Sequence, residues 1–255
     1  MDLIESDFTV TQRHPWELSR FSIVSGLIRR FNNANRKMKI LDIGSGDAYV
    51  AHKFTEVLDA ESICVDIGYS DELIDQISKV YDNEDLHLYH ALDQIEAVDG
   101  MDVVTFLDVI EHVADDVKLI TDVINSNLIK KDTIILITVP AYQNLFSNHD
   151  HLLKHYRRYN MKMLKETIHK SGLEMIYGGY FFMSLIPPRV LEVIKEKINP
   201  KEPDELKHLG NWEKGRWITE IICFILRMDY LIGEGLRKLG INIPGLSAFA
   251  VCKLS

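Results

Sequence analysis

The sequence predicts an α/β fold in which a mostly parallel sheet carries helices on both faces. Short apolar runs alternate with segments whose apolar residues follow helical spacing, and the first run ends in a glycine turn that opens a helix. The length of 255 residues suits one large α/β domain. We therefore expect a single domain over 1–255, with an N-terminal cap at 1–37 and a helical insertion at 183–240.

Composition restricts the classes of function. Lys and Arg number 29 against 38 Asp and Glu, so the net charge of -9 argues against a general nucleic-acid binder. Cys64, Cys223 and Cys252 are far apart in apolar contexts, which favours reduced core thiols and a cytoplasmic location. Residues 1–11 have no apolar core, so no signal peptide is predicted. No charge-free apolar run approaches the ~18 residues of a membrane span.

The first predicted helix precedes the first strand and is expected to cap the sheet edge. Pro15 suits a first helical position, and apolar residues at helical spacing run to an end near Asn32. These apolar residues are Phe21, Val24, Ile28 and Phe31. The segment 13–17 reads equally well as a simple helix entry with Trp16 packed inside.

A buried strand at 38–43 gives way to Gly44, Ser45 and Gly46, where missing Cβ atoms permit positive φ and let a ligand lie against the backbone. Asp47 is expected at a helix start. The helix stripe that faces the core is predicted to comprise Val50, Phe54, Val57 and Leu58. This strand, turn and helix start form the ligand crevice at the carboxyl edge of an open α/β sheet, where nucleotide-like ligands bind.

The glycine turn distinguishes between two nucleotide folds. A dinucleotide fingerprint needs a small residue three positions after Gly46, and Tyr49 stands there. The pattern of Asp42, Gly44 and Gly46, followed by Ala48, instead resembles motif I of the class I S-adenosylmethionine-dependent methyltransferases. The resemblance implies a Rossmann-like seven-stranded sheet with an antiparallel last pair. It also implies S-adenosyl-L-methionine as cofactor and S-adenosyl-L-homocysteine as product, with Asp42, Gly44, Ser45 and Gly46 at the cofactor. Leader helices of the family often close over the cofactor, so Arg20 is expected to pair with its carboxylate.

The second strand, 62–65, ends in Asp66, which lies 24 residues after Asp42. That spacing suits a carboxylate reaching a ribose hydroxyl at the next strand tip. By resemblance, Asp66 binds both ribose hydroxyls and Ile67 packs on the adenine. A helix at 71–80 and a strand at 86–90 follow. The resemblance then places Leu92 and Asp93 beside the adenine.

A buried strand at 103–107 ends in Asp108, and the segment 107–113 resembles the one after strand four in methyltransferases that act on quinones and related acceptors. The resemblance places Asp108 beside the methionine part of the cofactor. Glu111 and His112 are expected to be local hydrogen-bonding groups at a helix start. The stripe of the following helix is predicted to be Val113, Val117, Ile120, Ile124 and Leu128.

After a strand at 133–139 and Pro140, the polar, aromatic loop 142–159 allows three interpretations. His151 and His155, with His149 or Asp150, have the spacing of a metal site on a helix, but no supporting residues are recognisable and no metal is predicted. A solvated loop packed by its own aromatics is the second interpretation. We favour the third, an acceptor site in which His149 or His155 removes a proton.

In that acceptor site Arg157 and Arg158 are expected to hold an anionic group. The run from Val139 to Tyr159 resembles methyltransferases of the type 11/12 group, which are often seen in polysaccharide and lipid-linked pathways. The resemblance implies a small-molecule acceptor or one linked to lipid or saccharide. Tyr142, Asp150 and Tyr159 are the further substrate-binding candidates.

The remaining chain is expected to complete the sheet around an insertion. Asn160 can cap a helix that ends at Gly172, and strands at 173–182 and 248–254 form an antiparallel pair. Between them we predict an amphipathic helix after Pro187 and Pro188, a polar loop at 201–212 and a very apolar helix at 217–239. Its polar stripe is Glu220, Arg227 and Glu234. The insertion is interpreted as a lid, a homodimer surface, a hydrophobic acceptor pocket or a peripheral membrane contact.

The sequence thus predicts methyl transfer from S-adenosylmethionine by in-line displacement. The alternative is a non-catalytic, cofactor-binding subunit of another enzyme. A nicotinamide oxidoreductase is disfavoured by Tyr49.

Overall fold

The computed structural model describes residues 13–32, 36–96, 100–199, 212 and 214–255. The predicted sheet is present, with seven strands in the order β3-β2-β1-β4-β5-β7-β6. The strands are β1 (Met38–Ile43), β2 (Ala60–Val65), β3 (Leu86–Tyr89), β4 (Met101–Leu107), β5 (Ile129–Pro140), β6 (Leu173–Phe181) and β7 (Ser247–Leu254). The first five pair in parallel, whereas β7 runs antiparallel to both β5 and β6. The carboxyl ends of β1, β2 and β4 therefore meet at one edge, which positions the predicted cofactor residues together.

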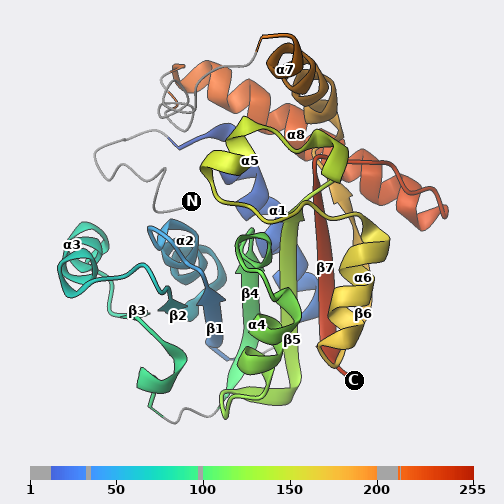
Figure 1. The fold of residues 1–255 in the computed structure, drawn as a ribbon. Coiled ribbons are helices and arrows are strands. Elements are labelled where there is room, and N and C mark those ends of the chain that lie inside the picture. The colour runs from blue at the N-terminus through green and yellow to red at the C-terminus, as the bar shows by residue number, and fades with distance from the viewer. Residues whose placement is uncertain (1–12, 33–35, 97–99, 200–211, 213) are drawn as a thin grey trace.

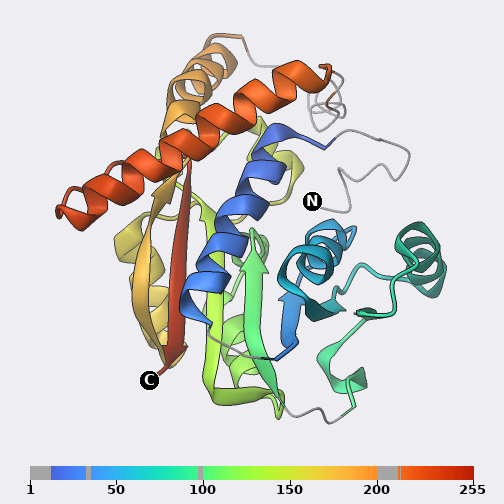
Figure 2. The same cartoon turned by 180° about the vertical axis from the view of Figure 1, so that it is seen from behind.

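Helices cover both faces of the sheet (Figure 1). The helices of the described residues are α1 (Pro15–Phe31), α2 (Tyr49–Leu58), α3 (Asp71–Tyr81), α4 (Asp116–Ile124), α5 (Asn148–Leu152), α6 (Met161–Lys170), α7 (Ile186–Ile198) and α8 (Arg216–Lys238). Figure 2 shows α1 and α8 crossing the same face, where α2 also packs. Helices α4 and α6 cover the opposite face.

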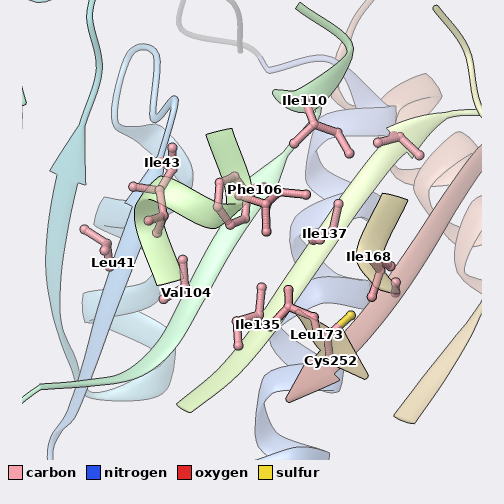
Figure 3. Packing of buried hydrophobic residues seen from close by; sticks show 14 of the residues in the cluster. Leu41, Ile43, Val104, Phe106, Ile110, Ile135, Ile137, Ile168, Leu173 and Cys252 are labelled. Carbon is pink, nitrogen blue, oxygen red and sulfur yellow. The ribbon is translucent and has the colours of Figure 1, made fainter. Parts of the chain in front are cut away.

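The central strands are continuous apolar runs in the sequence because core residues lie on both faces of the sheet. Residues of β1, β4 and β5 are buried on both sides, because helices lie over each face. Figure 3 shows the cluster under α4 and α6, in which Phe106 and Ile137 of neighbouring strands contact the same layer as Ile168 of α6. On the other face, Phe54 of α2 and Leu226 of α8 are buried in one cluster.

Several predicted boundaries shift. Helix α2 begins at Tyr49 instead of Asp47, because Ala48 has a φ of 58° and holds the chain in a left-handed turn before the helix. Val57, predicted to face the core, is 40% exposed. The predicted stripe from Val113 to Leu128 is wrong at both ends, since α4 begins at Asp116 and ends at Ile124.

The cause of the α4 shift is a local cap. The side chain of Asp115 accepts a hydrogen bond from the N–H of Lys118 at 2.9 Å, so the helix starts after Asp115. The cap predicted for the next long helix is confirmed, because the side chain of Asn160 accepts from the N–H of Met163 at 2.9 Å. Gly172 follows that helix with a φ of 79°.

Helix α8 differs from its predicted orientation. Glu220 and Arg227 are exposed, but Glu234 turns inward and accepts hydrogen bonds from Arg30 at 2.7 Å and Arg237 at 2.8 Å. Buried Asp229 accepts from the N–H and the hydroxyl of Ser184. The outward face is instead apolar, with Trp217, Ile218, Ile221, Phe224, Ile225, Met228, Leu231 and Ile232 all at least 40% exposed.

The predicted polar loop 201–212 lies outside the described residues except for Trp212, and so does the N-terminal segment 1–11. Among the residues that the structure does describe, no helix combines the length and apolarity needed to cross a bilayer.

Candidate active site

The glycine turn after β1 adopts the conformation that the sequence predicts. Gly44 and Gly46 have φ values of 67° and 55°, which favour glycine. A Cβ added to Gly44 would lie 2.7 Å from a methyl carbon of Val109, so the turn packs directly on the segment after β4. Ala48, which follows the turn, adopts a φ of 58°.

Asp66 is held at the tip of β2 by two backbone groups. Its Oδ2 accepts from the N–H of Gly46 at 2.9 Å, and its Oδ1 accepts from the N–H of Gly68 at 2.8 Å. Ile67 beside it is 96% exposed. Leu92 and Asp93 follow β3, which pairs with β2. Acidic and apolar residues thus follow the neighbouring tips of β2 and β3 at one edge of the sheet.

The side chains of Asp42 and Ser45 each form a buried hydrogen bond beside the turn. Asp42 is 3% exposed and accepts a hydrogen bond from the hydroxyl of Thr105 at 2.6 Å. Burial raises the pKa of Asp42 to about 6, although the hydrogen bond from Thr105 opposes the rise. The Ser45 hydroxyl and the Tyr69 hydroxyl are hydrogen-bonded at 2.7 Å.

Two arginines join α1 to the strand tips. Arg20, 3% exposed, forms an ion pair with Asp108, which follows β4 at a φ of 57°. Asp108 also accepts from the hydroxyl of Thr138 at 2.9 Å. Arg13, just before α1, pairs with Asp47 after the glycine turn. The structure therefore brings Arg20 and Asp108 together at the edge beside the turn.

Asp150 is the centre of the acceptor loop. It is fully buried and accepts from the N–H of Ser147 at 2.9 Å, His155 Nδ1 at 2.8 Å, Arg158 Nε at 2.7 Å and Arg189 Nη2 at 2.8 Å. Although burial alone would raise it, these bonds hold the pKa of Asp150 well below its usual range. Arg189, on α7, had no sequence signal beyond the preceding pair of prolines.

The other predicted acceptor residues line the same loop. Arg157 pairs with Asp116 at 3.0 Å, and the buried hydroxyl of Tyr159 donates to Asp116 at 2.7 Å. The ring of Tyr142 stacks on Tyr180 with centroids 5.2 Å apart. In this structure, therefore, the guanidinium groups of both Arg157 and Arg158 contact carboxylates of the chain itself.

The loop histidines His149, His151 and His155 lie in different surroundings. Burial, with Arg189 nearby, lowers the pKa of His149 to about 4, so its imidazole is neutral at pH 7. His151 is exposed and contacts the ring of Phe146 edge-on. The helical spacing considered for His151 and His155 is wrong, because α5 ends at Leu152. The ring of His155 instead meets that of His112 edge-on, with centroids 4.5 Å apart.

Glu111 was missed as a site residue. It lies in the 3-10 turn η2 (Ile110–His112) and is 0% exposed, and burial raises its pKa well above the usual value. Within the described part of the chain, neither of its carboxylate oxygens has a hydrogen-bond partner. The expected helix-start role is therefore wrong for its side chain. Its backbone carbonyl accepts from the N–H of Tyr156 at 2.8 Å, which joins the acceptor loop to the end of β4.

The sheet edge that carries the glycine turn, Asp66 and Ile67 (the donor edge) fits a nucleoside-containing ligand. The glycine turn has positive φ at Gly44 and Gly46, the Asp66 carboxylate is fixed at the strand tip, and the Ile67 side chain is almost wholly exposed. The acceptor loop follows β5, two strands away from the tip that carries the turn.

Solved structures share this fold at low sequence identity. A putative sarcosine dimethylglycine methyltransferase from Galdieria sulphuraria superposes with a TM-score of 0.59 at 12% identity, covering 92% of this chain and 85% of that one. A putative methyltransferase bound to the Trm112 activator of Haloferax volcanii gives 0.56 at 14% identity, over 93% and 90% of the chains.

A third similar structure is phosphoethanolamine N-methyltransferase 2 of Haemonchus contortus in complex with S-adenosyl-L-methionine. It gives a TM-score of 0.54 at 16% identity and covers 91% of this chain, which spans only 52% of that one. None of the curated proteins compared with the chain matches its sequence.

The family model described as "Methyltransferase domain" matches residues 17–177, which is more than half of the chain. The matched region contains α1 from Glu17 onward, the glycine turn, Asp66, Asp108 and the acceptor loop. The chain thus belongs to this methyltransferase domain family and is an enzyme whose methyl donor is S-adenosyl-L-methionine.

Proposed function

We propose that the protein transfers a methyl group from S-adenosyl-L-methionine to a small molecule, free or linked to lipid or saccharide, by in-line displacement. The observation that supports this most is the link between the two halves of the site. Gly44 packs on Val109, and two residues further along the carbonyl of Glu111 holds the acceptor loop through Tyr156. An acceptor on that loop is therefore adjacent to the donor.

In the proposed donor site, Asp66 binds the ribose hydroxyls, and Ile67, Leu92 and Asp93 surround the adenine. Arg20 and Asp108 form the end that receives the methionine part, where Arg20 can exchange Asp108 for the cofactor carboxylate. Bound S-adenosylmethionine supplies an electrophilic methyl group. The protein has to align the acceptor with that group and exclude water.

In the proposed acceptor site, His149 is the first candidate for a base and His155 the second. The lowered pKa of His149 keeps its imidazole unprotonated at neutral pH and thus able to accept a proton. Tyr142, Arg157, Arg158, Asp150 and Tyr159 shape the loop. Arg157 keeps 20% of its side chain exposed, against 5% for Arg158, so Arg157 is the better placed to meet an anionic acceptor.

The insertion 183–240 supports an apolar acceptor. The outward face of α8 is apolar over most of its length, and α7 adds Val190, Leu191, Ile194 and Ile198, all at least 36% exposed. We propose that this surface meets a lipid-linked substrate or the membrane that carries it, with a homodimer as the alternative occupant. Co-sedimentation with phospholipid vesicles, compared with molar mass in solution, separates the two. We further propose a cytoplasmic location, supported by three buried free cysteines.

The direct test is incubation with methyl-labelled cofactor and a cell extract, followed by mass spectrometry of labelled products. A labelled small molecule would identify both the acceptor and the methylated atom. Binding of S-adenosylmethionine without transfer to any extract component would instead favour the non-catalytic subunit.

A further inference from the structure

Three potential metal ligands converge beside the acceptor loop. One ligand atom each from Glu111, His112 and His155 lies within 4.8 Å of the other two. Glu111 and His112 come from the turn after β4, whereas His155 comes from the loop between α5 and α6. Two segments that are separate in sequence thus place a carboxylate and two imidazoles at one point.

The hydrogen bond from His155 to Asp150 fixes which ring nitrogen is available. Nδ1 lies 2.8 Å from Asp150 Oδ1, and Arg158 and Arg189 also donate to the same carboxylate. An ionised carboxylate only accepts, so Nδ1 donates to Asp150 and Nε2 is the ring nitrogen left to bind a metal. A carboxylate behind a histidine is the usual support of a metal-bound imidazole.

Glu111 supplies the independent observation. Its side chain is 0% exposed, and within the described residues both carboxylate oxygens lack hydrogen-bond partners. A buried polar group without a partner destabilises the fold by about 1–3 kcal/mol, and more when it is charged. A cation between Glu111 and the two imidazoles would give this buried carboxylate a partner.

We propose that Glu111, His112 and His155 bind one divalent transition-metal ion. Two imidazoles and a carboxylate suit ions such as Zn²⁺, whereas Ca²⁺ and Mg²⁺ prefer oxygen ligands alone. Ligand atoms around a tetrahedral ion with bonds of ~2.1 Å stand ~3.4 Å apart. Side-chain rotations that bring the three ligand atoms closer by up to about 1.4 Å would therefore complete the set.

Binding of the ion is argued from its three ligands alone. Only the role of the ion in catalysis rests on the proposed function, which it extends. Three protein ligands leave a coordination position open, as catalytic metal sites do. An acceptor hydroxyl at that position would have a lowered pKa and could pass its proton to His149. His155 would then be a metal ligand, and His149 alone would be the base.

The test uses the full chain, stripped with a chelator and titrated with Zn²⁺ by calorimetry in the absence of cofactor and acceptor. We expect one Zn²⁺ per chain. Glu111→Gln and His155→Gln are each expected to weaken binding at least tenfold, while the exposed neighbour His151→Gln serves as the matched control and binds as before. Replacing Zn²⁺ with Co²⁺ gives a second readout, because visible absorption of bound Co²⁺ should be lost with the same variants.

Absence of saturable Zn²⁺ binding, or equal affinity in Glu111→Gln and the unsubstituted chain, would overturn the metal site. Thermal unfolding of each variant checks its fold, and if Glu111→Gln does not fold, the comparison of His155→Gln with His151→Gln decides. Because the titration needs neither donor nor acceptor, its result is independent of whether methyl transfer is found.

Discussion

Arg20 on α1 and Asp108 at the end of β4 are joined by an ion pair across 88 positions of the chain. Arg20 is almost wholly buried, whereas the Asp108 side chain retains 26% exposure. With Arg13 paired to Asp47, the start of α1 is attached to the tips of both β1 and β4. The helix that was predicted as a cap is thus part of the site wall.

The Arg20 and Asp108 pair predicts unequal effects of its two substitutions. Asp108→Asn leaves the buried guanidinium without its charge partner and should reduce the free energy of unfolding by about 3–5 kcal/mol. Arg20→Met should cost less, because Asp108 is partly hydrated and still bonded to Thr138. Urea unfolding of both variants and the double variant measures this, and strictly additive losses would contradict the direct coupling.

Gly44→Ala should abolish detectable binding of S-adenosylmethionine. The new Cβ would stand 2.7 Å from Val109, at a φ of 67° that also disfavours side chains. Calorimetric titration measures the loss. Gly26→Ala is the matched control, because nothing lies within 4 Å of a Cβ there. In the interior of α1 it should raise stability by about 0.5–1 kcal/mol and leave cofactor affinity unchanged.

Asp66→Ala should weaken cofactor binding while the fold is retained. Loss of charge-assisted hydrogen bonds to the ribose costs about 1.5–3 kcal/mol, which corresponds to roughly 10- to 150-fold in Kd. Asp75→Ala on the exposed face of α3 removes a carboxylate of the same kind outside the site. Equal Kd values for the two variants in calorimetry would remove Asp66 from the donor site.

Asp42→Asn should stabilise the protein at alkaline pH. The folded-state pKa of Asp42 is raised from 3.8 to about 6, so the folded protein holds a proton that the unfolded chain releases. The charging penalty is absent below pH ~4, grows between the two pKa values and is complete above pH ~6. Asparagine can still accept from Thr105, so unfolding free energy should rise by on the order of 3 kcal/mol at pH 8. Denaturant unfolding at pH 4 and pH 8 tests this, and an equal gain at both would disprove the raised pKa.

His149→Gln should lower turnover by about 10²–10⁴-fold if His149 is the base. Because its pKa lies near 4, the acid limb of kcat/KM should fall near pH 4 and not near the 6.5 of an ordinary histidine. The measurement uses the acceptor found with labelled cofactor. Unchanged turnover would exclude His149 as the base and leave the methyltransferase assignment intact.

Local patterns were enough to predict the sheet and the glycine turn after its first strand. Buried parallel strands are apolar throughout, and the turn at Gly44 and Gly46 favours residues without a Cβ. Both features can therefore be recognised from a few consecutive residues. The place of Asp66 at the tip of β2 was predictable because the second strand tip falls at a regular distance after the first. The positive φ of Ala48 could not be predicted from its residue type, since the surrounding turn imposes it.

The acceptor side depends on distant contacts and was less predictable. Arg189 reaches Asp150 from 39 positions away, so no local spacing could relate them. Among the described residues the Glu111 carboxylate has no hydrogen-bond partner, which depends on the packing around it and not on a local sequence pattern. For α8, periodicity distinguishes two faces but not which one packs inward, and Glu234 lies on the face that α1 covers because Arg30 provides a partner.

The place of β7 has a consequence for how the protein is made. β7 follows β5 and β6 in the chain and pairs with both of them. Until it arrives, both of those strands expose unpaired backbone groups, the feature that promotes pairing with other chains. Without β7, β5 loses one neighbour and β6 has no partner among the described strands, so a premature stop within 247–254 would produce a chain prone to aggregation even though every proposed donor-site residue had been translated.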